Sequence, residues 1–161
     1  MRNPKSKIIQ LCLFVLTVAL SMSSCSRKTI YSHYEHTPID GWGWGQSDTL
    51  YFSVAPVREG GVFAEQIGIR MNTAYPFMGL SLVVRQKTKL SGVSRKDTVT
   101  VKVTDEDGNY LGRGFSLYEH LLPLPDIKLE DDDSLSISVW HFMRRENLRG
   151  ISDVGITLTR R

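Results

Sequence analysis

Cysteine is scarce in this sequence: among its 161 residues only Cys12 and Cys25 occur. Cys12 lies inside an apolar run near the N-terminus, and Cys25 follows the end of that run. Outside this segment no thiol is left for a disulfide, a zinc thiolate or a cysteine nucleophile. We therefore expect the fold to be held together by its apolar core alone.

A hydrophobic run long enough to span a membrane is also missing near the N-terminus. The apolar stretch there, residues 8–20, has 13 residues, whereas a helix needs about 20 to cross roughly 30 Å of hydrocarbon. Arg2, Lys5 and Lys7 precede it, and small residues lead from it to Cys25. This order is typical of a lipoprotein signal peptide. The alternatives are an ordinary secretory signal with an incidental Cys25, or an uncleaved anchor helix.

The signal-peptide interpretation predicts three segments. Residues 1–24 are removed, residues 25–28 form a short tether with lipid on Cys25, and residues 29–161 form one domain. Each buried methylene of the lipid contributes about 0.8 kcal/mol, so two or three chains hold a folded domain on a membrane without a spanning helix. The remaining 137 residues are enough for a single core.

An excess of either charge is absent from the predicted mature chain. The whole sequence has 20 basic and 17 acidic residues. Removal of residues 1–24 takes away three cations and no acid, which leaves 17 of each. Nucleic-acid binding requires a retained basic surface, so we expect no nucleic-acid partner.

Helical periodicity is weak, and apolar residues instead alternate with polar ones in six segments. Only residues 117–122 and 144–149 could support a helical turn, and both are too short to be persuasive. The alternating apolar sets are Leu50/Phe52/Val54, Ile67/Ile69/Met71, Leu80/Leu82/Val84, Val99/Val101/Val103, Leu135/Ile137/Val139 and Val154/Ile156/Leu158. With a first β-compatible stretch at 29–34, these predict an all-β fold. We expect an antiparallel β-sandwich of about seven or eight strands, with a closed barrel as the alternative.

Two acidic clusters offer oxygen ligands for a metal. In residues 105–109 the Asp-Gly step predicts a hairpin turn, and an EF-hand loop is excluded because its twelfth position is Ser116 and its flanks read as strands. Residues 130–133 are most simply a solvated loop that discourages edge pairing. We therefore expect no metal site.

Catalytic signatures are missing as well. His33 and His36 would point to opposite faces of a strand, and His120 and His141 are isolated in the sequence. No nucleophile elbow and no phosphate-binding loop occur. The sequence therefore predicts a protein that is not an enzyme, with no cofactor.

Aromatic residues, by contrast, are concentrated in two unusual segments. Trp42 and Trp44 are each flanked by glycine, so each indole must find a partner in the core, in another protein or on a sugar face. Tyr75 and Phe77 lie on either side of Pro76, which favours an extended approach to a turn. A core plug and a buried hairpin corner are the structural interpretations, and a binding patch is the functional one.

The sequence resembles the GldH-type gliding-motility lipoproteins of Bacteroidetes. The resemblance rests on Cys25, the segment 31–34, a tryptophan before the strand 48–52, and the segment 69–77 followed by the strand 80–84. It implies a membrane-anchored accessory of an envelope machine for gliding or linked protein secretion, with no catalytic residues. The segment 26–29 after Cys25 carries Arg27 and Lys28 and no acid, which suggests a periplasm-facing domain within that group.

We therefore predict a lipoprotein that binds partner proteins in the cell envelope. The residues predicted to contact the partner are Trp42, Trp44, Tyr75 and Phe77, and the predicted lipidation site is Cys25. The alternative is a carbohydrate-binding lipoprotein that stacks sugars on Trp42 and Trp44.

Overall fold

A computed structural model describes residues 29–38 and 42–161. They form eleven strands, whose bounds are β1 Thr29–His36, β2 Trp44–Gly45, β3 Leu50–Val54, β4 Gly61–Met71, β5 Gly79–Thr88, β6 Ser94–Lys102, β7 Arg113–Gly114, β8 Tyr118–Leu129, β9 Leu135–His141, β10 Asn147–Leu148 and β11 Ile151–Arg160. Three of these have only two residues, so eight longer strands carry the fold. Cys25 lies outside the described residues.

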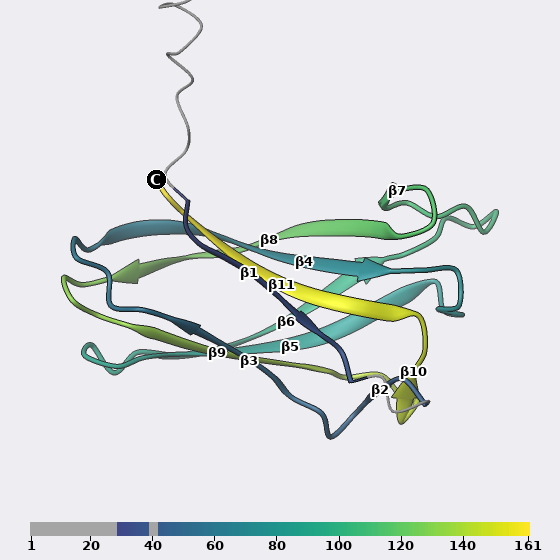
Figure 1. The fold of residues 1–161 in the computed structure, drawn as a ribbon, viewed down its shortest axis with the longest axis horizontal. Helices are drawn as coiled ribbons and strands as arrows, with labels where there is room; N and C mark the ends of the chain where they lie inside the picture. The colour runs from purple at the N-terminus through teal and green to yellow at the C-terminus, as the bar shows by residue number, and fades with distance from the viewer. Residues whose placement is uncertain (1–28, 39–41) are drawn as a thin grey trace, which may run out of the picture.

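The strands form two main antiparallel sheets that face each other (Figure 1). One sheet has the order β1-β11-β4-β8-β7 and the other has the order β3-β9-β5-β6, while β10 and β2 form a small separate ribbon. The all-β antiparallel sandwich predicted from alternation is confirmed. The closed-barrel alternative is wrong, because the sheets keep separate edges at β1, β3 and β6.

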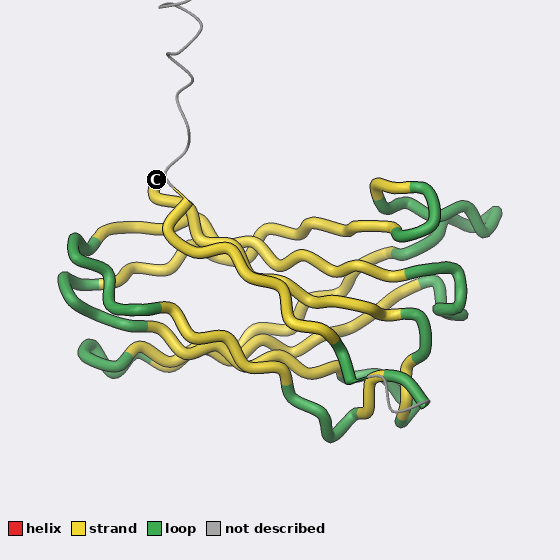
Figure 2. Tube along the Cα trace, viewed as in Figure 1, coloured by secondary structure: helices red, strands yellow, loops and turns green. Residues whose placement is uncertain are grey.

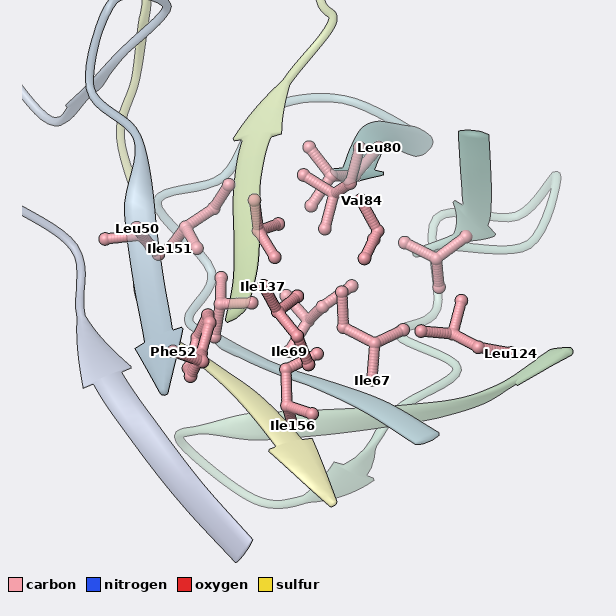
Figure 3. Close-up of a cluster of buried hydrophobic side chains, with 14 of the residues drawn as sticks. Leu50, Phe52, Ile67, Ile69, Leu80, Val84, Leu124, Ile137, Ile151 and Ile156 are labelled. Atoms are coloured by element: carbon pink, nitrogen blue, oxygen red, sulfur yellow. The ribbon is translucent and has the colours of Figure 1, made fainter. Parts of the chain in front are cut away.

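The core lies between the two sheets and is built from the alternating residues. Ile67 and Ile69 of β4 and Ile156 of β11 face Ile137 of β9 and Val84 of β5 across the sandwich (Figure 3). All of these side chains are at most 1% exposed. Since a strand buries every second side chain, the two-residue alternation predicted correctly which residues point inward.

The helical turns considered for residues 117–122 and 144–149 do not form. Residues 118–129 belong to β8, and residues 147–148 belong to β10. Pro123 and Pro125 obscured β8 in the sequence, because proline cannot donate to a sheet. The strand tolerates them because β7 pairs with only its first two residues, which leaves most of that side of β8 an edge. Among the described residues no helix is long and apolar enough to cross a membrane.

Loops gather at the two ends of the sandwich (Figure 2). We call the end at which β1 begins the proximal end; it carries the connections 55–60, 89–93 and 130–134. The C-terminus lies at this end too, beside the start of β1 (Figure 1). We call the opposite end the distal end; it carries residues 42–49, 72–78, 103–117 and 142–150. All four aromatic residues predicted to bind a partner therefore belong to the distal end.

Candidate partner-binding site

The four predicted contact residues divide into two buried and two accessible ones. Trp44 and Tyr75 are 0% and 2% exposed and belong to the core. Trp42 is 68% exposed, and Phe77 is partly buried against the core. The side chains of Trp44 and Tyr75 are therefore inside the domain, and Trp42 and Phe77 are the two predicted contact residues that reach the surface.

Trp44 acts as a plug at the distal end of the core. Its indole Nε1 donates to the carbonyl of Asp48 at 2.8 Å, and its ring meets the His141 imidazole edge-on, with centroids 5.3 Å apart. His141 Nε2 in turn lies 3.2 Å from the carbonyl oxygen of Trp44. Burial lowers the pKa of His141, which favours the neutral ring in this apolar setting. Trp44 is consequently unable to serve as a platform for a sugar.

Tyr75 packs against Phe77 from the core side. The Tyr75 hydroxyl donates to the carbonyl of Gly79 at 2.8 Å, and burial raises its pKa. The two rings pack edge-to-face with centroids 5.5 Å apart, an arrangement that aromatic pairs prefer. The buried Tyr75 ring thus packs against the partly buried Phe77 ring.

Trp42 and Phe77 line the same groove at the distal end. It has a volume of about 750 Å³ and is open to solvent. Its lining residues are Trp42, Ala74, Pro76, Phe77, Arg145, Glu146, Asn147 and Arg149. Three separate loops therefore build one groove, and two of the four predicted residues meet in it.

Gly43 brings the tryptophan loop to this place. It has a φ of +94°, which is costly for residues other than glycine, and a Cβ on it would collide with the carbonyl of Leu148. Gly43 thus lets the chain run close against β10. The pairing of β2 with β10 then fixes Trp42 beside the loop that carries Arg145 and Arg149.

Sequence reasoning missed the arginines of the groove. Arg145 and Arg149 are exposed, and each presents a planar guanidinium that binds carboxylates and stacks on aromatic rings. Phe142, on the same connection, is 67% exposed. The signal was an aromatic residue followed closely by arginines, but the pattern of residues 144–149 indicated only a possible helical turn. Apolar rings, two guanidinium groups and the Glu146 carboxylate therefore meet in the groove, which suits an apolar or aromatic group flanked by charged or polar ones.

Three of the four histidines and the first acidic cluster make contacts within the domain. His36 pairs with Asp153 at 2.5 Å and His33 with Glu35 at 2.9 Å, while burial lowers the pKa of His120. In the predicted turn at 105–109, Asp105 accepts backbone N–H groups of the turn itself. No group of three or more His, Cys, Asp or Glu residues able to hold a metal occurs in the part of the chain that the structure describes.

The 130–133 cluster differs from the prediction. Its first three acids are exposed, but Asp133 is fully buried. The Asp133 carboxylate accepts N–H groups from Lys89, Leu90 and Ser91 at 3.0, 2.8 and 3.3 Å. These bonds lower its pKa to about 2. Asp133 is therefore an anchor for the β5–β6 hairpin and not part of a solvated loop.

The fold and the groove place the chain among the all-β antiparallel sandwich domains. Within that class the chain belongs to the GldH lipoprotein family, whose model matches residues 29–158. A curated relative, "Gliding motility lipoprotein GldH" of Flavobacterium johnsoniae, is 25% identical over 153 residues, covering 89% of this chain and 92% of the relative. The family that the sequence resembles, the GldH-type gliding-motility lipoproteins, is thus confirmed as the family of this chain.

Solved structures with a similar strand arrangement are only distant matches. A cellulose-specific carbohydrate-binding module of family 28 is 11% identical with a TM-score of 0.38, over 80% of this chain and 70% of the module. The dimeric latent PorU of Porphyromonas gingivalis is 9% identical with a TM-score of 0.35, over 85% of this chain and 14% of PorU. Neither likeness bears on function at this level.

Proposed function

We propose that the chain is a non-catalytic accessory or structural component of the gliding-motility or linked secretion machinery. It binds partner proteins of the envelope through the distal groove. In this proposal residues 1–24 are a cleaved signal peptide, residues 25–28 are a tether, and lipid on Cys25 holds residues 29–161 at the membrane, facing the periplasm.

The observation that carries this proposal is the composition of the groove. Trp42 and Phe77 supply apolar area, and Arg145, Arg149 and Glu146 supply charged groups. Tryptophan, tyrosine and arginine dominate the energetics of protein interfaces. Aromatic rings and guanidinium groups bind and orient a partner, but an arginine keeps its proton at neutral pH and is a poor acid or base. Binding is therefore the function that these groups serve best.

The position of the groove also favours a role in connecting the membrane anchor to a partner protein. The loops that line the groove lie at the end of the sandwich opposite the start of β1 (Figure 1). An anchor on Cys25 would leave the groove accessible while it raises the local concentration of the domain at the membrane. The carbohydrate alternative loses one of its two stacking residues, because Trp44 is buried.

Photo-crosslinking in living cells tests the partner interface. A photoreactive phenylalanine analogue is placed at position 42, and a matched control is placed at position 51, where Tyr51 is 72% exposed on β3. We expect a discrete envelope protein to be captured from position 42 only. Arg145→Glu together with Arg149→Glu should reduce that capture several-fold. Equal captures from positions 42 and 51 would show that the groove is not the interface.

A further inference from the structure

The tip of the hairpin between β5 and β6 exposes two apolar side chains at the proximal end. Leu90 is 62% exposed and Val93 is 55% exposed, although turn positions of this kind usually carry polar residues. The hairpin projects at the same end as the connections 55–60 and 130–134 (Figure 1). Ile30, near the start of β1, is 38% exposed at this end as well.

The tip is held in one conformation. The buried Asp133 carboxylate accepts three consecutive backbone N–H groups of the tip and the Ser91 hydroxyl at 2.8 Å. The Thr88 hydroxyl oxygen accepts the N–H of Val93 at 2.8 Å and lies 2.7 Å from the Ser91 hydroxyl. A tip fixed in this way presents Leu90 and Val93 without the entropic cost of ordering a loop on contact.

Charges of both signs surround these apolar side chains. Lys87 and Lys89 are exposed beside the tip, and the exposed acids of residues 130–132 lie on the neighbouring connection. Lysine side chains can lay their methylenes along an apolar layer and keep the ammonium group in water. The mixture of signs means that attraction to an anionic surface is weak here, so contact must depend on the apolar side chains.

The length of the N-terminal segment limits how far this end can be from the bilayer. Cys25 precedes Thr29, the first residue of β1, by four residues. At no more than about 3.6 Å per residue, that segment spans about 14 Å when fully extended. A lipid-anchored chain therefore keeps the proximal end close to the headgroup layer.

We propose that the proximal end rests on the bilayer, with Leu90 and Val93 of the β5–β6 tip in the headgroup region. This inference rests on the lipid anchor of the proposed function. The hairpin is a second point of contact beside the lipid, and two separate contacts restrict the tilt of the sandwich. The distal groove then points away from the membrane, toward partners in the compartment.

Spin labelling of the lipidated protein tests this contact. Full-length protein purified from membranes is reconstituted into vesicles of phosphatidylethanolamine and phosphatidylglycerol. Leu90→Cys is labelled with a nitroxide, and the matched control is Leu111→Cys, since Leu111 is 50% exposed at the distal end. Collision rates with oxygen, which concentrates in lipid, are compared with those of a water-soluble nickel chelate. We expect an oxygen-to-nickel ratio several-fold higher at position 90 than at position 111, and unchanged at high salt.

Three outcomes would overturn the proposal, and they have separate causes. Equal ratios at positions 90 and 111 in protein that floats with the vesicles would show an anchored domain whose tip stays in water. Protein that fails to float would refute the anchor itself, and the tip contact with it. A label at position 90 that is shielded from both reagents in detergent as well would show that the tip is covered by protein, for example a second copy.

Discussion

The most informative perturbation of the fold concerns Glu65, a buried carboxylate between the two sheets. Its side chain is 0% exposed. It accepts hydrogen bonds from the Gln86 side-chain amide and from Arg95 Nη2, the latter at 3.1 Å. Burial outweighs these bonds and raises the pKa of Glu65 from 4.5 to about 7. The folded protein therefore favours the protonated form more than the unfolded chain does.

This difference makes the free energy of unfolding depend on pH with a definite sign. The folded-state pKa is the higher one, so the contribution is fully present below about pH 4.5 and is lost as the pH rises through about 7. One pKa unit corresponds to about 1.36 kcal/mol. The rise of the Glu65 pKa to about 7 thus predicts a loss on the order of 3 kcal/mol between about pH 4 and about pH 8.

Glu65→Gln isolates the effect. Glutamine has nearly the same shape and carries no titrating proton. Arg95 keeps hydrogen bonds to the carbonyls of Pro125 and Asp126 at 2.9 and 3.1 Å, so the substitution does not leave the guanidinium without partners. Relative to wild type, we expect the variant to gain stability progressively as the pH rises from about 4 to about 8.

Urea denaturation of the chain from residue 26 onward, followed by tryptophan fluorescence at several pH values, measures this difference. Glu106→Gln on an exposed turn controls for the change in net charge. The difference between Glu65→Gln and wild type should vary by about 3 kcal/mol over that pH range. A difference that is independent of pH would refute the conclusion that burial raises the pKa of Glu65.

Three further predictions concern named contacts. Asp133→Asn should lower the melting temperature at neutral pH and have little effect near pH 2. The reason is that the depressed Asp133 pKa of about 2 contributes stability that is lost as the pH falls from about 4. Calorimetry over that pH range measures the change in melting temperature. Gly155→Val should destabilise the fold by about 1–3 kcal/mol, because the valine side chain would meet the Tyr34 ring, which lies 2.6 Å from the Cβ position. In the Tyr34→Ala background, urea denaturation should show a much smaller destabilisation by Gly155→Val. Trp44→Phe should cost at least about 1 kcal/mol through the lost bond to Asp48, whereas Trp42→Phe should leave unfolding by urea nearly unchanged.

Each of these predictions has an outcome that would contradict it. Equal losses for Asp133→Asn at neutral and acid pH would mean that the carboxylate charge is not what anchors the hairpin. Additive effects of Gly155→Val and Tyr34→Ala would mean that the two positions do not touch. Equal effects of the two tryptophan substitutions would contradict their different burial.

The fold class could be predicted from the sequence because one side of each strand is buried. Leu135, Ile137 and Val139 alternate with polar residues in the sequence and are each at most 1% exposed. β8 could not be predicted, because Pro123 and Pro125 break the pattern and are tolerated only because β7 leaves that side of β8 unpaired beyond its first two residues. Glu65 also escaped notice, since a carboxylate inside a β-sandwich is identified only by the residues that surround it.

The candidate site divides in the same way. The sequence singled out Trp42 and Phe77 as aromatic residues in unusual segments, but it gave Trp44 and Tyr75 equal weight. Phe77 and Arg149 line one groove although they are far apart in the sequence, so the sequence alone does not show that they meet. Burial of an aromatic ring depends on which loops pack against it, and that information is spread over segments far apart in the chain.

The sequence by itself determined the all-β class, the inward face of six strands and the family to which the chain belongs. Alternation is a local property, set by the two-residue repeat of a strand. Only the tertiary structure decided which aromatics are exposed, where the groove lies and which carboxylates are buried. These properties arise from contacts between segments far apart in sequence, and such contacts exist only once the two sheets have packed together.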